Sequence, residues 1–473
     1  MPDDAIPPEK FWHNLQMIIS TLSRYRSIAI FACLVSLNTG STSAAARPDE
    51  IQRLSHDLTP VGAQRSGNAN GSIPDWNGGL STPPENYKTG DYHADPFATE
   101  QALFRIDQNN YQDYEEQLGT GQIAMLLRYE SWFIEVYPSH RSAALPPRVY
   151  QKTAENGRTG HLSSDGEAVL DVAEGLPFPF PDNGRELIWN HRLRYKGTGS
   201  LRHISLVAPS PGGAFNEVTM TVATLGLYYQ PGATLEKIDN QLLYFLQQTE
   251  APARLSGSAL LVYESLNPIE QPRNAWVYNP GQRRVIRAPN VSYDNPTAAS
   301  DGLHVSDMTD MFNGALDRFE WELLGKREIF VPYNAYRVHR SDLGFDELVS
   351  TGHIKPQYLR YELHRVWVVE ARLKAGQRHI NPHRTYYLDE DSYQILMVDH
   401  YDSKDELWKY SEAHPIVFYE VPTLWTTLEV HHDLQSGRFV AYRLNPRKPV
   451  PAFNMEMNPN DFTPQALRRK GTR

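Results

Sequence analysis

Short apolar runs bounded by turn residues dominate the chain from about Leu201 onward, and this pattern predicts strands. Two acidic turns, at residues 389–392 and 402–405, separate consecutive runs and favour hairpins. We therefore predict a mainly β fold with some helix, built on a large, mostly antiparallel sheet. The predicted strands are Leu260–Tyr263, Ala275–Tyr278, Val285–Arg287, Glu328–Pro332, Tyr361–Ala371, Arg384–Leu388, Tyr393–Tyr401, Ile416–Val421, Thr426–His431 and Arg438–Leu444.

The part of the chain before this sheet has a different pattern. Residues 58–92 are rich in Gly, Pro, Asn and Asp, which favour turns, while Trp76, Leu80 and Tyr87 provide anchors for an ordered wrap without regular structure. Helical periodicity follows at residues 109–117, 121–129 and 182–195. We predict that residues 47–200, the wrap plus short helices, pack with the sheet of residues 201–473 as one domain.

The N-terminus has the pattern of an export signal. Arg24 and Arg26 precede the apolar run 27–37, which is too short to span a bilayer, and small residues follow at 43–46. We predict that residues 1–46 are a signal peptide, that the true start is Met17, and that the mature protein lies in the periplasm of a Gram-negative bacterium. A membrane-anchoring N-terminal helix is the alternative.

Composition narrows the class of protein. The 473 residues are 40% hydrophobic and 22% charged, as in a folded globular chain. Lys and Arg total 46 against 56 Asp and Glu, a net charge of -10, which disfavours nucleic acid as a partner. The single cysteine, Cys33, lies in the predicted signal peptide, so the mature protein has no disulfide, thiol nucleophile or cysteine metal ligand.

Metal and cofactor motifs are absent from the sequence, and we predict neither a metal nor a cofactor. His379 and His383 have the spacing of helical metal ligands, but Pro382 lies between them and favours a turn. His431 and His432 point to opposite faces of a predicted strand, so we expect surface and packing roles for them. The acidic residues 389–391 are expected to form a solvated hairpin tip.

The segment Trp276–Pro289 predicts a hairpin with a basic second arm. An Asn-Pro-Gly turn separates two strand-like runs, and Arg283, Arg284 and Arg287 follow the turn. Guanidinium groups bind phosphate and carboxylate in a bidentate manner, so the arm is a candidate contact for an anionic head group or partner. Cross-strand ion pairing with acidic neighbours is the alternative.

Several unusual motifs carry a resemblance to a known family. The segments 58–63, 67–79 and 138–144, together with the arginine hairpin, resemble the Gram-negative family of unknown function numbered 1329 in the domain-of-unknown-function series, over essentially the whole mature chain. Residues 276–289 and 386–396 also look like the outer-membrane lipoprotein-sorting superfamily typified by LolA and LolB. The resemblance implies a curved, incomplete β-barrel with helices over its concave face and an apolar cavity between them.

The function implied by this resemblance is a periplasmic carrier or adaptor. It would bind a lipid or hydrophobic small molecule and work with an envelope transport system, because family members are often encoded beside an RND-type transporter and an outer-membrane β-barrel protein. No covalent chemistry is required, so we predict that the protein is not an enzyme. The predicted ligand-binding residues are Trp276, Tyr278, Trp367, Arg283, Arg284 and Arg287, with core packing as the alternative for the aromatic residues.

Two other functions remain open at this stage. The first is a non-catalytic docking or assembly factor for an outer-membrane β-barrel, which would use exposed sheet edges and the wrap. The second is a periplasmic hydrolase with Asp399 and His400 as acid and base, although no motif surrounds these residues.

Overall fold

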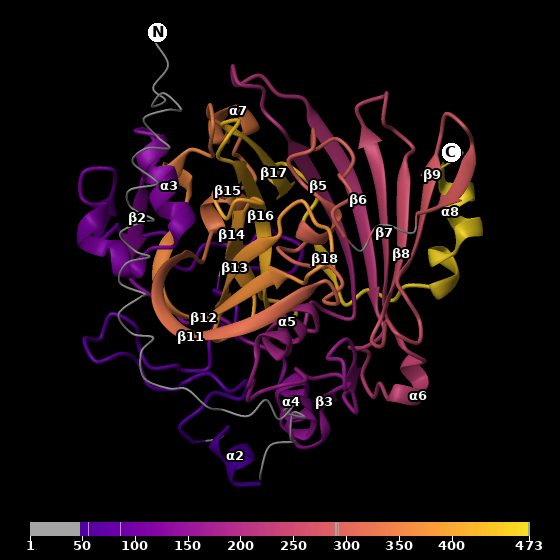
Figure 1. Ribbon diagram of the computed structural model, residues 1–473, viewed down its shortest axis with the longest axis horizontal. Helices are drawn as coiled ribbons and strands as arrows, with labels where there is room; N and C mark the ends of the chain where they lie inside the picture. The colour runs from indigo at the N-terminus through magenta and orange to yellow at the C-terminus, as the bar shows by residue number, and fades with distance from the viewer. Residues whose placement is uncertain (1–47, 55, 86, 289–290, 292, 472–473) are drawn as a thin grey trace.

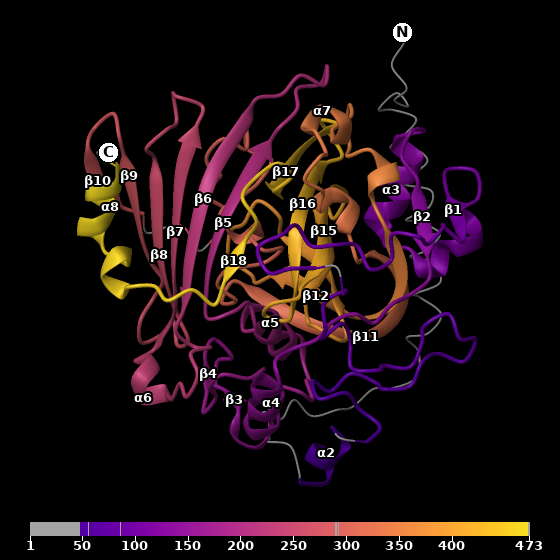
Figure 2. The same cartoon turned by 180° about the vertical axis from the view of Figure 1, so that it is seen from behind.

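A single large sheet organizes the molecule, as Figure 1 shows from one side and Figure 2 from behind. The computed structural model describes residues 48–471 except 55, 86, 289, 290 and 292, so the predicted signal peptide lies outside the described residues. Sixteen strands form the sheet, in the order β1-β2-β12-β13-β14-β15-β16-β17-β5-β6-β7-β8-β9-β10, with β11 paired to β12 and β18 to β5.

The strands are β1 (Phe104–Ile106), β2 (Ile134–Tyr137), β5 (Gly199–Val207), β6 (Glu217–Gly226), β7 (Gln241–Ala251), β8 (Ala259–Ser265), β9 (Asn274–Asn279), β10 (Arg284–Arg287), β11 (Phe319–Pro332), β12 (Tyr361–Leu373), β13 (His383–Asp389), β14 (Ile395–Tyr401), β15 (Leu407–Phe418), β16 (Thr423–Asp433), β17 (Arg438–Leu444) and β18 (Ala452–Phe453). All neighbours are antiparallel except the short β2–β12 pair. Among the described residues no pairing joins β10 to the opposite edge, so the barrel is incomplete, as predicted.

The helices are short and lie around the sheet. They are α2 (Pro48–Arg53), α3 (Thr120–Arg128), α4 (Pro147–Thr159), α5 (Gly184–Arg192), α6 (Leu235–Ile238), α7 (Phe345–Leu348) and α8 (Pro464–Gly471), with 3-10 turns at Tyr111–Gln117, Ser306–Met308, Tyr336–His339, Pro356–Tyr358 and Pro459–Phe462. The three predicted helices are present, the first as a 3-10 helix, whereas α4 was not predicted. A small hairpin of β3 (His161–Leu162) and β4 (Val169–Leu170) stands apart from the main sheet.

Cross-strand neighbours define the two faces of the sheet. Tyr386, Val398, Ser411, His431 and Val440 are successive partners on β13 to β17, and we call their side the inner face. Helix α5 packs on this face. Helix α3 packs on the opposite, outer face.

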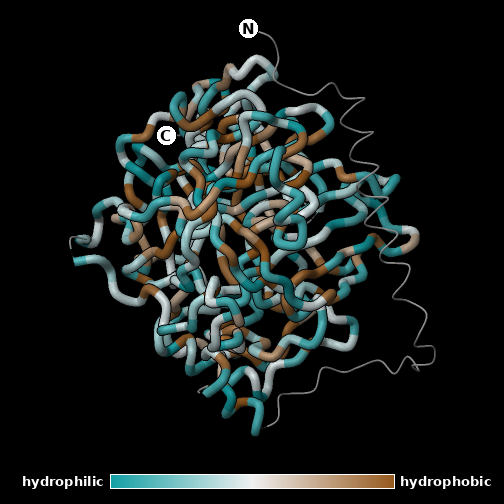
Figure 3. The backbone as a smooth tube through the Cα atoms, turned by 90° about the vertical axis from the view of Figure 1, so that its left-hand side faces the viewer, coloured by the Kyte–Doolittle hydropathy of each residue, from teal (hydrophilic) through white to brown (hydrophobic). Residues whose placement is uncertain are grey.

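The C-terminal helix covers another part of the outer face. Helix α8 lies beside β8, β9 and β10 (Figure 2). Its buried Leu467 joins Phe462 and Leu261 in one apolar cluster. The larger core combines residues from before and after residue 200, and Figure 3 shows hydrophobic segments running through the middle of the molecule.

Strand β15 departs most from the prediction, which placed a strand at Ile416–Val421. The strand runs from Leu407 to Phe418, through Lys409, Glu412 and Pro415, and the sequence pattern there is too polar to indicate a buried strand. Pro415 has no N–H to donate, and the register shifts between His414 and Pro415, so a bulge accommodates it. Strands β5, β6 and β7 also form without having been individually predicted.

The wrap of residues 58–92 is held by charged groups rather than by regular structure. Arg141 donates to both carboxylate oxygens of Asp391 at 2.8 and 2.7 Å, and to the carbonyls of Gln64 at 2.7 Å and Arg65 at 2.9 Å. Glu390 accepts from the backbone N–H of Gln64. The prediction of a solvated tip at 389–391 is therefore wrong: the turn exists, but the wrap and these ion pairs bury its three carboxylates.

Candidate functional site

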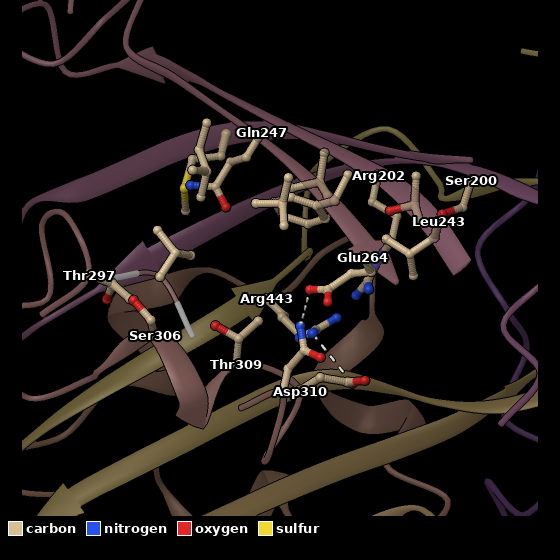
Figure 4. A pocket seen from close by; sticks show the side chains of 18 of the residues that line it. Ser200, Arg202, Leu243, Gln247, Glu264, Thr297, Ser306, Thr309, Asp310 and Arg443 are labelled. Atoms are coloured by element: carbon tan, nitrogen blue, oxygen red, sulfur yellow. Dashed lines mark hydrogen bonds and ion pairs between the residues drawn. The ribbon is translucent and has the colours of Figure 1, made fainter. Parts of the chain in front are cut away.

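A cavity of ≈ 430 Å³ lies against the inner face of strands β5 to β9. The opposite wall comes from residues 295–313, between β10 and β11, and from Trp425, Tyr442 and Arg443 on β16 and β17. Its volume lies within the usual range of about 300–1,000 Å³ for small-molecule sites. Figure 4 shows Glu264, Asp310 and Arg443 gathered in one group, with Gln247 and Thr297 farther away.

The strand wall of the cavity is mainly apolar. Its side chains come from alternate positions on adjacent strands, so they share one face of the sheet. The apolar members on this wall are Leu206, Met220, Val222, Leu243, Phe245, Leu260, Val262 and Val277. Water cannot form hydrogen bonds with an apolar wall, so its displacement by an apolar ligand is favourable.

Basic side chains are concentrated at the end of the cavity near helix α5. Six basic side chains and two carboxylates line the cavity: Arg192, Arg194, Lys196, Arg202, Arg273 and Arg443 against Glu264 and Asp310. Asp310 pairs with Arg194 at 2.7 Å, Lys196 at 3.0 Å and Arg443 at 3.4 Å. These cations hold the pKa of Asp310 well below its usual value, even though burial alone raises it.

Two of these arginines are only weakly compensated. Glu264 lies 2.7 Å from Arg273 but 3.8 Å from Arg192, and burial lowers the pKa of Arg192 to about 10. Arg202 is 2% exposed, stacks over Trp425 at 4.1 Å and donates to the carbonyl of Thr426 at 3.0 Å. Within the described part of the chain it forms no ion pair, and burial, followed by repulsion from Arg443, lowers its pKa to about 9.

Three residues beside the cavity have the geometry of metal ligands. His304, Glu429 and His431 are buried and offer atoms within 4.8 Å of one another. Their surroundings oppose a dication, because Arg443 already pairs with Glu429. Burial, then Lys409 and Arg443, lowers the pKa of His431 to about 3. The local charge therefore favours an anion.

A second group of possible metal ligands, His364, Asp389 and Asp391, lies away from the cavity. Arg141 already occupies both oxygens of Asp391. Tyr333 donates to Asp389 at 3.1 Å. Most carboxylate oxygens of this group therefore already accept hydrogen bonds from protein side chains.

The aromatic residues predicted to bind ligand lie outside the cavity lining. Tyr278 is 1% exposed and packs in the outer-face cluster under helix α8. Trp276 packs edge-on against Tyr263 in the same cluster, and Trp367 lies under the amine of Lys326 at 4.2 Å. Only Val277, between the first two, reaches the cavity, because successive side chains of a strand point to opposite faces.

The three arginines of the predicted hairpin are exposed on β10 and its turn. Arg287 donates to the side chain of Asn274, and the described residues contain no ion pair of Arg283, Arg284 or Arg287. The cross-strand ion pairing considered as an alternative is thus not formed. None of these three arginines lines the cavity, although Arg287 contacts the neighbour of Arg273 in the chain. The basic end of the cavity was not predicted from the sequence.

The predictions for the histidines of β16 are partly correct. His431 and His432 are both buried, so the surface role expected for them is wrong, while their placement on opposite faces of β16 is correct. His379 pairs with Asp307 at 3.0 Å, whereas His383 contacts Glu370 at 2.9 Å. These two histidines belong to separate networks.

Asp399 and His400 do not form an acid–base pair. Asp399 lies on the outer face and accepts from the N–H of Gly121 at 2.9 Å and the hydroxyl of Tyr387 at 2.9 Å. His400 lies on the inner face, 3.0 Å from the hydroxyl of Ser411. Adjacent strand positions point apart, so these two groups cannot share a proton.

The basic end of the cavity had a weak signal in the sequence. Arg192, Arg194 and Lys196 alternate from the last residue of helix α5 onward, and Arg202 lies within strand β5. A buried strand with one arginine is unusual, since arginine is rarely buried without a partner. The convergence of β5 with residues from α5 and β17 depends on long-range folding, so the sequence could not reveal the cluster.

The fold and the cavity define an open, curved β-sheet protein with an internal cavity. The chain belongs to the family described as "Protein of unknown function (DUF1329)", whose model matches residues 105–468. An uncharacterized protein of Pseudomonas aeruginosa is 43% identical over 445 residues, covering 93% of this chain and 97% of that protein.

Two solved structures align with part of the chain. A DUF1329 family protein from Desulfovibrio piger is 17% identical, with a TM-score of 0.41, over 60% of this chain and 97% of that one. A LolA superfamily protein from Nitrosomonas europaea is 12% identical, with a TM-score of 0.37, over 60% of this chain and 98% of that one. Among the described residues, no helix is both long and apolar enough to cross a membrane.

Proposed function

We propose that this protein is a periplasmic carrier that binds a lipid or other hydrophobic molecule in the inner-face cavity. The observation that supports this function is the cavity itself, ≈ 430 Å³ with a mainly apolar wall on β5 to β9. Apolar burial would drive binding, and the sheet would shield the ligand from water during transit. No catalytic group is needed for this role.

The proposal extends to the compartment and the partners. An export signal at residues 1–46 would place the protein between two membranes, where a hydrophobic molecule needs a shield from water. The carrier would exchange its ligand with an envelope system, for which an RND-type transporter and an outer-membrane β-barrel protein are the candidates.

The first test combines ligand identification with a blocked cavity. The protein is purified from its own periplasm, denatured, and any released small molecule is identified by mass spectrometry. The purified protein is then titrated with Nile red, a neutral hydrophobic dye. We expect a stoichiometric hydrophobic ligand in the extract and saturable dye binding to the emptied protein.

Cavity-blocking variants locate the dye. Val262 is 5% exposed and lies on the cavity wall, so Val262→Trp fills the space, and Val262→Phe is a smaller change for the case in which the first does not fold. Ile286→Trp is the matched control, because Ile286 is 50% exposed on β10 outside the cavity lining. Loss of dye binding in the first pair alone supports the proposal. Equal binding in all variants, or no binding to the wild-type protein, contradicts it.

A second function, docking to an outer-membrane β-barrel protein, draws on a different observation. Strand β10 is a sheet edge, it carries the exposed side chains of Arg284, Ile286 and Arg287, and Arg283 lies in its turn. A free edge with basic side chains suits an acidic partner strand. Replacing the three arginines with Ala would abolish such docking while dye binding in the cavity continues.

A further inference from the structure

We infer that the ligand of this cavity is an amphiphile with an anionic oxyacid head group, a carboxylate or a phosphate, held by the basic side chains around Arg202. This inference rests on the proposed function and names its ligand class. Within the cavity, the apolar wall would hold the tail, and the basic end would hold the head group.

The first step of the argument is charge balance. Six basic side chains line the cavity against two carboxylates, and a third carboxylate, that of Glu429, contacts Arg443 from beside it. Even with Glu429 included, the site has a net positive charge in a region shielded from water. An uncompensated charge in such a place is costly, and an anionic ligand would remove the imbalance.

The second step is the set of unused donors. The Nε atoms of Arg192, Arg194 and Arg202 are buried, and each lacks a hydrogen-bond partner within the described structure. Buried guanidinium donors are normally satisfied. All three side chains line one cavity, and an acceptor bound there would reach these Nε donors after a small rotation of the guanidinium groups, because the Nε atoms themselves have almost no exposed surface without a ligand. Carboxylate and phosphate oxygens are the acceptors that match guanidinium geometry.

The third step is that burial destabilises the charged forms of Lys196 and Arg202. Burial lowers the pKa of Lys196 to about 8, despite the attraction of Asp310. Burial and Arg443 lower the pKa of Arg202 to about 9. The protein therefore holds these cations against a desolvation penalty that an anion would offset.

The fourth step is the path from the head to the tail. Arg202 on β5 is the cross-strand partner of Val222 on β6. The next partners across the sheet are Gln247 on β7, Leu260 on β8 and Val277 on β9. All five line the cavity. At about 4.8 Å per strand, this row spans about 19 Å, so a single chain could lie across the strands with its head at Arg202.

The test compares amphiphiles that share one tail. Hexadecanoate, hexadecyl phosphate and hexadecan-1-ol are titrated separately against the delipidated protein by displacement of Nile red. We expect the two anions to bind about tenfold to a hundredfold more tightly than the alcohol, because hydrogen bonds to charged groups contribute more than neutral ones. Inorganic phosphate, which has no tail, should not displace the dye.

The variant Arg202→Met removes the head-group contact. It should abolish most of the preference for the anions. The affinity for hexadecan-1-ol should change by less than about threefold, because the alcohol forms only a neutral hydrogen bond at this place. Arg105→Met is the matched control, because Arg105 is exposed on β1 and pairs with Glu135 far from the cavity lining. Arg202→Lys keeps the charge and should retain part of the preference; it replaces the first variant if that one does not fold.

A stability measurement separates a ligand contact from a structural role. Arg202 has no ion-pair partner in the described chain, so unliganded Arg202→Met should melt at or above the wild-type temperature.

Equal binding of alcohol and anions by the wild-type protein overturns the inference and leaves the proposed function standing. Failure of all three amphiphiles to bind overturns both. Displacement by inorganic phosphate alone would show a site for a free anion and also overturn the inference.

Discussion

Replacing Arg141 tests whether buried charge holds the wrap of residues 58–92 on the sheet. The side chains of Arg141 and Asp391 are 3% and 4% exposed. The variant Arg141→Ala leaves the Asp391 carboxylate buried without its partner and frees the carbonyls of Gln64 and Arg65. Removing one member of a buried ion pair costs about 3–5 kcal/mol of unfolding free energy.

The expected size of the effect can be converted to a melting temperature. At about 2.1 cal/mol/K per residue, the 473-residue chain unfolds with an entropy of about 1.0 kcal/mol/K, so the loss lowers the melting temperature by about 3–5 °C. Differential scanning calorimetry measures this shift. Limited proteolysis should also cut within residues 58–92 sooner in the variant than in the wild type.

Two further variants control this experiment. Arg141→Lys keeps the charge but cannot reach both oxygens of Asp391 and the carbonyls together, so it should fall between wild type and Arg141→Ala. Arg53→Ala breaks an exposed pair with Asp57 and should leave the melting temperature nearly unchanged, because solvent screens exposed pairs. If Arg141→Ala melts within the error of wild type and resists protease equally, buried charge does not hold the wrap.

Three other predictions concern a buried acid, the C-terminal helix and the basic hairpin. Burial raises the pKa of Asp399 to about 6, so its contribution to stability is present below the unfolded pKa near 3.8 and is lost as the pH rises through 6. The free energy of unfolding of wild type minus Asp399→Asn, from urea titrations, should fall by about 2 kcal/mol between pH 4 and 7; a constant difference contradicts this. Leu467→Ala should cost about 2–5 kcal/mol by calorimetry, against less than about 0.5 kcal/mol for the exposed Leu235→Ala. The double variant Arg283→Ala/Arg284→Ala should leave the melting temperature nearly unchanged, since both side chains are exposed, and a large decrease would assign them to the structure.

The outcome at two turns shows what local pattern can decide. The acidic segments 389–392 and 402–405 both form hairpin turns, as predicted, because turn propensity depends on neighbouring residues. Their environments differ: Asp402 stays near solvent, whereas Asp389 is fully buried. Groups distant in sequence bury the first turn: Tyr333 donates to Asp389, while Arg141 pairs with Asp391.

The cavity shows the same division. The chemistry of Trp276 and Tyr278 predicts a ligand contact, but strand alternation and helix α8 direct both side chains to the outer face. The intervening Val277 faces the cavity. Residue type can suggest candidate ligand contacts. Only the register of β8 and β9 and the covering helix decide which side chains face the cavity.

By itself, the sequence determined the mainly β class, most strand positions, the antiparallel arrangement and the family resemblance, which in turn implied the open barrel. These depend on periodicity, turn residues and long motifs, all of which are local in the chain. The tertiary structure alone decided where the cavity lies and that Arg192, Arg202 and Arg443 meet at one end of it. That convergence joins strands and a helix that are distant in sequence, and the balance of buried charge exists only once they pack together.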